Sequence, residues 1–179
     1  MNSTPAATID RRRALSKKGG EKMPLYEKTL ERVLDIAELQ LGYTEQPKNS
    51  NRTKYGAWMG LDGQPWCMSF VQWVFKRAGF NLFRTGSCSA LVEQYRRSAP
   101  AQIITEGFQP GDIVFFDWSG QRKITEHVGI VVDTAPGSVV TIEGNTAVGD
   151  DSNGGAVMRR TRPLAMITCA IRPKYPAAK

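Results

Sequence analysis

The sequence predicts an α+β fold in which helices from the first part of the chain pack on an antiparallel β-sheet formed by the second part. Apolar residues recur three and four positions apart before Pro100, which is the spacing of amphipathic helices. After Pro100 the chain changes to short runs rich in β-branched and aromatic residues, separated by Gly, Pro, Asp and Asn. Helices followed by strands indicate an antiparallel sheet, because a parallel sheet requires the two to alternate.

The first helix is expected to follow Leu25 and to end at Gly42, because glycine commonly terminates helices. The next stretch, Gln46–Gln64, is polar and rich in Asn and Gly, so it is interpreted as a long loop. Loops of that length usually carry function. The inward face of the helix is formed by apolar residues at helical spacing: Leu30, Val33, Leu34, Ala37 and Leu41.

A second helix is expected over Cys67–Ala78, with Pro65 close to its start and Gly79 after its end. This helix places Cys67 in its first turn. A third helix is expected over Ser89–Arg97, with Ser89 as its N-cap. The strands are predicted at Ile113–Phe116, Val128–Val132, Val139–Ile142, Val157–Arg160 and Ile167–Ile171.

Three parts of the chain are expected: a flexible basic arm at residues 1–24, one folded domain at 25–175, and a short tail at 176–179. The net charge of +7 is concentrated near the start, where residues 1–25 carry six Lys or Arg and two acidic residues. Short basic tails are usually solvated, so no nucleic-acid partner is predicted. No apolar run approaches the roughly 20 residues of a membrane span, and no apolar export signal follows Arg11–Arg13, so neither a transmembrane segment nor signal-dependent export is expected.

The three cysteines, Cys67, Cys88 and Cys169, are an odd number without the spacing of a zinc site. A disulfide framework is therefore not expected, and a reducing compartment is the simpler inference. Cys88 lies near the start of a helix in a Ser-rich turn, and Cys169 lies in an apolar strand where a thiol usually serves packing. Both are expected to be replaceable by serine.

Cys67 is the candidate nucleophile, because the unpaired N–H groups and the positive end of a helix favour a thiolate. The alternative is a buried cysteine that only packs. His127 is the single histidine, so a Cys–His pair can only use this residue. It opens a predicted strand, where it could equally be a structural histidine.

Two residues of the next strand, Glu143 and Asn145, alternate onto one face of the predicted sheet. Either side chain could accept the imidazole N–H of His127 and fix the tautomer and direction of the ring. The residues alone leave open which of the two does so.

Four separate segments of the chain follow a known pattern: Gly60–Trp73, Pro110–Trp118, His127–Val131 and Thr141–Thr146. Together they resemble the CHAP domain, the cysteine, histidine-dependent amidohydrolase/peptidase of bacteria and their phages. The resemblance covers roughly residues 28–173 in the family's own order. It also extends to the end of the chain, where Ser152–Gly155 and Arg159–Arg162 look like the closing hairpin of that family.

The resemblance implies a papain-like, NlpC/P60-like fold with a CHAP catalytic domain at 25–175. It implies that Cys67 attacks, His127 transfers the proton, Glu143 orients His127, and Asn145 supports the set. The Cys67 N–H and a second donor would form hydrogen bonds to the oxyanion. The candidate oxyanion-binding and substrate-binding residues are Gln64 and Trp66, and the alternative for Gln64 is a solvent-exposed residue that only fills the turn.

Neither a cofactor nor a metal ion is expected. Some phage members of the family bind calcium through acidic residues before the cysteine, but here that loop offers only Asp62. The loop before the histidine also departs from the Asp- and Gly-rich pattern of many relatives.

The resemblance further implies a peptidoglycan hydrolase that cleaves either the muramoyl–L-alanine amide or a stem or cross-bridge peptide bond. A phage endolysin is expected, held in the host bacterial cytoplasm until a holin releases it to the cell wall. The protein is expected to be a monomer, with any wall-binding module on a separate subunit. The alternatives are an amidase for a non-wall substrate, such as a glutathione–polyamine conjugate, and an inactive wall-binding or phage structural protein.

Overall fold

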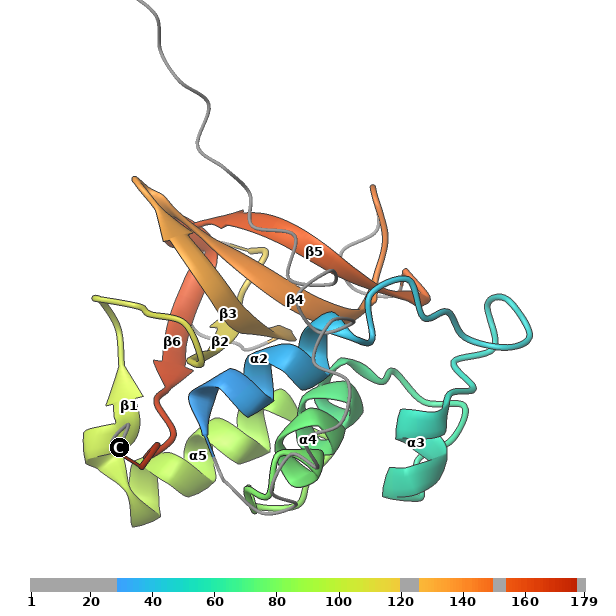
Figure 1. Ribbon diagram of the computed structural model, residues 1–179, viewed down its shortest axis with the longest axis horizontal. Helices are drawn as coiled ribbons and strands as arrows, with labels where there is room; N and C mark the ends of the chain where they lie inside the picture. Colours follow the sequence, from blue (N-terminus) through green and yellow to red (C-terminus); the bar gives the residue numbers. More distant parts are fainter. Residues whose placement is uncertain (1–28, 120–125, 150–153, 177–179) are drawn as a thin grey trace, which may run out of the picture.

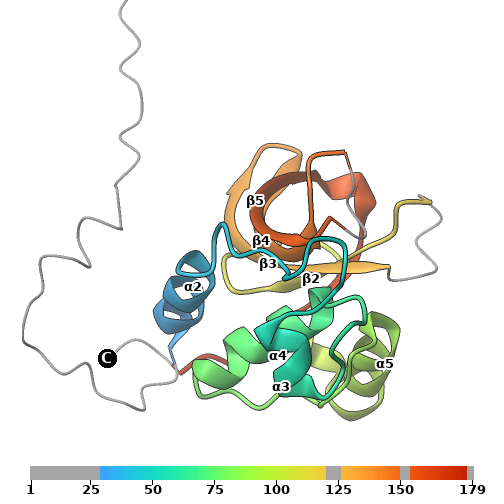
Figure 2. The same cartoon turned by 90° about the vertical axis from the view of Figure 1, so that its right-hand side faces the viewer.

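The computed structural model describes residues 29–119, 126–149 and 154–176. The basic arm expected at residues 1–24 lies outside the described residues, as does most of the tail expected at 176–179. Helices lie on one side of a twisted sheet in both views of the ribbon (Figure 1 and Figure 2). The predicted α+β fold is confirmed. No helix among the described residues is long and apolar enough to cross a membrane.

The sheet has six antiparallel strands in the order β1-β6-β2-β3-β4-β5. All five predicted strands are present, and β3 and β4 extend beyond their predicted ends into a hairpin that is exposed at its tip. The two-residue edge strand β1 was not predicted, because so short a pairing leaves no alternation in the sequence. The strands are β1 (Ile103–Ile104), β2 (Ile113–Phe116), β3 (His127–Ala135), β4 (Ser138–Thr146), β5 (Ala156–Pro163) and β6 (Ile167–Ile171).

The first described helix, α2 (Leu30–Glu38), begins where the Thr29 side chain accepts a hydrogen bond from the Arg32 N–H. Its buried residues are Val33, Leu34 and Ala37, as the apolar spacing predicted. Burial of this stripe fixes α2 against α4 and the sheet, since apolar surface removed from water stabilises by roughly 25 cal/mol per Å².

The predicted long loop contains a helix, α3 (Lys54–Met59), so the prediction of a structureless stretch was wrong in this part. Thr53 caps α3 by accepting from the Gly56 N–H, and Gly60 ends it in the left-handed conformation. Six residues are too few to show a helical period in the sequence. The helix places Tyr55 in the core, stacked on Trp66 with ring centroids 5.5 Å apart.

The two remaining helices are α4 (Cys67–Arg77) and α5 (Cys88–Ser98). The predicted α4 is confirmed with Cys67 as its first residue. The N-cap of α5 is Ser87 and not the predicted Ser89, because the Ser87 hydroxyl accepts from the Ala90 N–H. The correction moves Cys88 from the turn into the first position of the helix.

α4 packs directly on the sheet because Gly144 of β4 has no side chain. A Cβ at Gly144 would lie 2.6 Å from the Phe70 Cβ and 2.8 Å from Cζ3 of Trp66, which is closer than atoms pack. The close approach brings the start of α4 beside β3 and β4, the two strands that carry the predicted histidine and acid.

Candidate active site

Cys67 is the first residue of α4 and is 7% exposed. Its N-cap residue, Trp66, makes no side-chain capping hydrogen bond. The first amide groups of the helix are therefore not all used by a cap, and the backbone N–H of Met68 contributes to lowering the pKa of Cys67. A thiolate at this position gains both an N–H donor and the positive end of the helix dipole.

His127 is the first residue of β3, where it pairs with Phe116 of β2 and is completely buried. Its Nε2 lies 3.0 Å from Oε2 of Glu143 on β4. Among the described residues Nδ1 has no hydrogen-bond partner, so it is the ring nitrogen that remains to serve the Cys67 thiol. Of the two acceptors that the sequence left open, Glu143 is the one that bonds the imidazole.

Glu143 is itself held from two further directions. Thr141 donates its hydroxyl to Oε1 at 2.6 Å. Arg162 of β5 donates Nε to Oε1 at 2.8 Å and Nη2 to Oε2 at 2.5 Å, in the paired geometry that suits a carboxylate. Burial raises the pKa of Glu143, but the hydrogen bonds from Arg162 and His127 outweigh burial and lower it to about 2. Glu143 is therefore a carboxylate at any pH at which the enzyme would work.

Arg162 was not predicted as a site residue. The sequence shows three arginines in four positions, Arg159–Arg162, and alternation alone does not say which of them points inward. The structure buries Arg162 to 3% exposure, with its guanidinium 4.8 Å from the ring centre of Trp118. A buried guanidinium beside an aromatic face is held rigidly, so Arg162 fixes Glu143 as Glu143 fixes His127.

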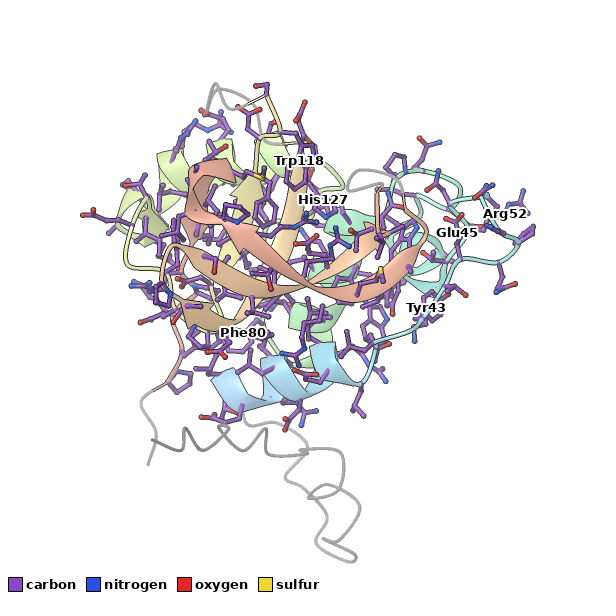
Figure 3. All side chains as sticks on the ribbon, turned by 90° about the horizontal axis from the view of Figure 1, so that it is seen from above. Tyr43, Glu45, Arg52, Phe80, Trp118 and His127 are labelled. Atoms are coloured by element: carbon purple, nitrogen blue, oxygen red, sulfur yellow. The ribbon has the colours of Figure 1, made fainter. Side chains whose placement is uncertain are left out.

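Trp118 was also missed, although its segment carries part of the family resemblance. Its ring lies 5.9 Å from the His127 ring, and Figure 3 shows these two side chains side by side. The Trp118 ring is also stacked on the Phe116 ring, with ring centroids 5.3 Å apart. The backbone N–H of Trp118 donates to Oε2 of Glu126 at 3.0 Å, which ties together the two described ends of the loop before His127. The Trp118 ring thus packs against both the imidazole of His127 and the guanidinium of Arg162.

The charges of the site favour a thiolate–imidazolium pair. A hydrogen bond from Cys88 and the nearby His127 lower the pKa of Cys67 well below its ordinary value, although burial acts in the opposite direction. Burial lowers the pKa of His127, but the neighbouring Cys67 and the hydrogen bond with Glu143 outweigh burial and raise it to about 9. Both shifts favour the state in which His127 carries the proton and Cys67 the negative charge.

Asn145 is buried on β4 and has a φ of +60°, a conformation that asparagine tolerates better than most residues. The pairing of β4 with β5 shifts between Glu143 and Thr146, so the strand bulges at this point. The simple alternation that placed Glu143 and Asn145 on one face does not hold through the bulge. The supporting role of Asn145 stays a prediction.

The two predicted oxyanion-binding and substrate-binding residues differ in their placement. Gln64 is exposed, and its N–H bonds to the carbonyl of Leu61 in the turn before Pro65. Trp66 is completely buried, and its indole N–H donates to Oε2 of Glu45 at 3.4 Å. The Trp66 ring therefore offers no surface to a substrate, which corrects the prediction for this residue.

Among the described residues, no three His, Cys, Asp or Glu side chains are grouped so that they could hold a metal ion. Asp62, the one acid of the loop before Cys67, accepts a hydrogen bond from the Thr53 N–H. Calcium needs six to eight oxygen ligands. We expect EDTA to lower activity by less than about tenfold, measured as fragment release before and after dialysis. Loss of activity that calcium alone restores would contradict this expectation.

The sequence profile of the CHAP domain matches residues 58–145, a segment that includes Cys67, His127, Glu143 and Asn145. The chain contains a CHAP domain. No curated protein matches the chain. Among solved structures, this CHAP protein is similar to the endolysin LysIME-EF1, with 18% identity and a TM-score of 0.57 over 83% of this chain and 66% of that chain.

Two further solved structures are similar to the CHAP protein at lower scores. Ly7917 has 16% identity and a TM-score of 0.47 over 81% of this chain and 62% of that chain. A protein described as similar to lipoprotein of the NLP/P60 family, from Staphylococcus aureus Mu50, has 16% identity and a TM-score of 0.46 over 92% and 48%. The chain spans 66% or less of the length of these three structures. At these identities the likeness concerns the fold alone.

The pKa of His127 predicts the alkaline limit of activity in the CHAP protein. The imidazolium is present below pH about 9 and is lost as the pH rises through that value. Hydrolysis should therefore fall by roughly tenfold per pH unit above about pH 9, because no protonated His127 remains to serve the leaving amine. The Cys67 thiolate persists there, so iodoacetamide labelling of Cys67 should not fall. A parallel fall of both rates would contradict the assignment.

Proposed function

We propose that the protein is a peptidoglycan hydrolase that cleaves an amide bond of the bacterial cell wall by cysteine nucleophilic catalysis. The observation that supports the proposal best is the buried Cys67–His127–Glu143 arrangement within the segment that matches the CHAP domain. The match to the CHAP domain implies peptidoglycan as the substrate.

In the proposed mechanism the Cys67 thiolate attacks the carbonyl carbon of the amide and forms a C–S bond. The carbonyl oxygen becomes an oxyanion, which the Cys67 N–H and a second donor, for which Gln64 is the candidate, would stabilise. The tetrahedral intermediate collapses as the C–N bond breaks, and His127 gives its proton to the departing amine. A thioester to Cys67 remains.

The thioester is then hydrolysed by water. Neutral His127 removes a proton from the water, which attacks the thioester carbonyl. The C–S bond breaks, the carboxylic acid product leaves, and Cys67 returns to the thiolate beside protonated His127. Glu143 stays ionised throughout, because its role is to hold the ring and to stabilise the imidazolium.

An endolysin of a phage or prophage is the biological role that we propose, acting at the cell wall after release from the host cytoplasm. The likeness of fold to an endolysin structure is compatible with this role. The bond is proposed to be either the muramoyl–L-alanine amide or a peptide bond of the stem or cross-bridge.

Digestion of purified peptidoglycan, followed by mass spectrometry of the soluble fragments, tests the proposal. A new free N-terminus at L-alanine would identify an amidase, whereas a new N-terminus within the stem or cross-bridge would identify an endopeptidase. Wall treated with Cys67→Ala is the matched control. Two results together would favour an amidase for a non-wall substrate. The wild-type protein would leave peptidoglycan of several cell-wall chemotypes intact, and it would hydrolyse glutathionylspermidine.

A further inference from the structure

Two cationic side chains share one carboxylate oxygen in the candidate site. Oε2 of Glu143 lies 3.0 Å from Nε2 of His127 and 2.5 Å from Nη2 of Arg162. The two nitrogens are therefore no farther apart than these two distances together. The three residues come from β3, β4 and β5, which are neighbours in the sheet (Figure 1). When His127 is protonated, two positive charges face each other across this oxygen.

Both cations are buried, and both pack on the same two aromatic rings. His127 is fully buried and Arg162 is 3% exposed. The centre of the Trp118 ring lies 4.8 Å from the Arg162 guanidinium and 5.9 Å from the His127 ring. For the Phe116 ring the same two distances are 5.6 Å and 6.1 Å. Solvent and salt screen buried charges much less than exposed ones, so the guanidinium and the imidazolium repel each other strongly.

The acids around His127 act in the opposite direction. Burial lowers the pKa of His127, but Cys67 and Glu143 outweigh burial and raise it to about 9. Two further acids, Asp117 and Glu126, lie on the segments beside the site, where they accept hydrogen bonds from backbone N–H groups. A general acid and base works best with a pKa near the pH of the reaction. An imidazole with acids alone around it would hold its proton too tightly for this work.

We propose that Arg162 is a positioning residue that, besides holding Glu143, lowers the affinity of His127 for its proton. The guanidinium repels the imidazolium across the shared oxygen, so His127 can give its proton to the departing amine and can then act as the base in thioester hydrolysis. Arg162 keeps its own charge throughout, and the proton passes only between His127 and the reacting groups. The inference rests on the proposed role of His127 as acid and base, and not on the identity of the substrate.

The single histidine makes a direct test possible, because protein labelled with carbon-13 at the histidine Cε1 gives one imidazole signal. The midpoint of the His127 titration is measured by NMR in the parent and in three variants. Arg162→Gln keeps an amide donor without the charge, Arg162→Met removes both, and Arg162→Lys keeps the charge. We expect the midpoint to rise by about one pH unit or more in Arg162→Gln and Arg162→Met, and to stay close to the parent in Arg162→Lys.

A role that is only structural predicts a shift of the opposite sign. If Arg162 served only to hold Glu143 in place, its loss would release the carboxylate from His127, and the midpoint would fall toward the ordinary value of about 6.5. A fall, or equal midpoints in all four proteins, would overturn the proposal.

A double variant, Glu143→Gln with Arg162→Met, gives a second measurement where the single Arg162 variants fold poorly, because it leaves neither member of the buried ion pair without its partner. Its midpoint should lie above that of Glu143→Gln alone. An equal or lower midpoint would contradict the repulsion between Arg162 and His127.

Wall hydrolysis provides the link to catalysis. The alkaline limit of activity should move upward in Arg162→Gln, in the same direction as the NMR midpoint, while it stays in place in Arg162→Lys. The NMR titration needs no wall substrate. A raised midpoint in Arg162→Gln without any wall hydrolysis by the parent protein would leave the effect of Arg162 on His127 standing and overturn the proposed function. Wall hydrolysis by the parent with an unchanged midpoint in Arg162→Gln would overturn this inference alone.

Discussion

Replacement of Cys67 by alanine or serine is expected to abolish the release of soluble fragments from purified peptidoglycan. The expected loss is on the order of 10⁴-fold or more, because no other group can form the covalent intermediate. A serine hydroxyl in this place would not ionise beside His127 as a thiol does. The measurement is the initial rate of turbidity decrease together with fragment release.

Cys169→Ser is the matched control for this loss. Cys169 lies in β6 and is 1% exposed, and burial raises the pKa of its thiol. A buried thiol that stays protonated serves packing and is a poor nucleophile. We expect this variant to keep most of the activity. Wall lysis by Cys67→Ala at the wild-type rate would exclude Cys67 as the nucleophile.

The second large effect is expected for Glu143→Gln. The neutral amide no longer stabilises the imidazolium of His127, so turnover should fall by about 10²- to 10⁴-fold and the midpoint of Cys67 alkylation should rise. The substitution also leaves the Arg162 guanidinium buried without its carboxylate, which we expect to cost about 3–5 kcal/mol of unfolding free energy. Activity must therefore be measured well below the melting temperature of the variant.

Asn145→Ala provides the comparison, because the amide carries no charge. It should lower turnover with a smaller change in the alkylation midpoint of Cys67. If Asn145→Ala moves the midpoint and Glu143→Gln does not, the two roles are reversed and Asn145 is the residue that orients His127.

Much of the fold could be predicted from the sequence because its elements are amphipathic in a regular way. The stripe on α2 and the alternating strands after Pro100 carry their period in the residue order. Cys67 could be placed in a first helical turn because Pro65 precedes an apolar helical pattern. His127 could be predicted as the partner of Cys67, since it is the single histidine.

The rest depends on contacts between residues far apart in the chain. Arg162 meets Glu143 across the pairing of β4 and β5, and a pattern of three arginines does not show which one turns inward. The cap of α5 lies two residues earlier than predicted, and the connection before it is bonded back to α4 through Gln72. Trp66 was misassigned because position beside the nucleophile does not reveal that a side chain enters the core.

The dependence of Cys67 alkylation on pH, compared between the wild-type protein and His127→Ala, is the most direct test of the thiolate–imidazolium pair. In the variant Glu143 still pairs with Arg162, so the protein should fold. We expect the wild-type midpoint to lie well below the roughly 8.5 of an ordinary thiol, and the variant midpoint to move upward toward that value. Equal midpoints in the two proteins, or a wild-type midpoint near 8.5, would contradict the pairing of Cys67 with His127.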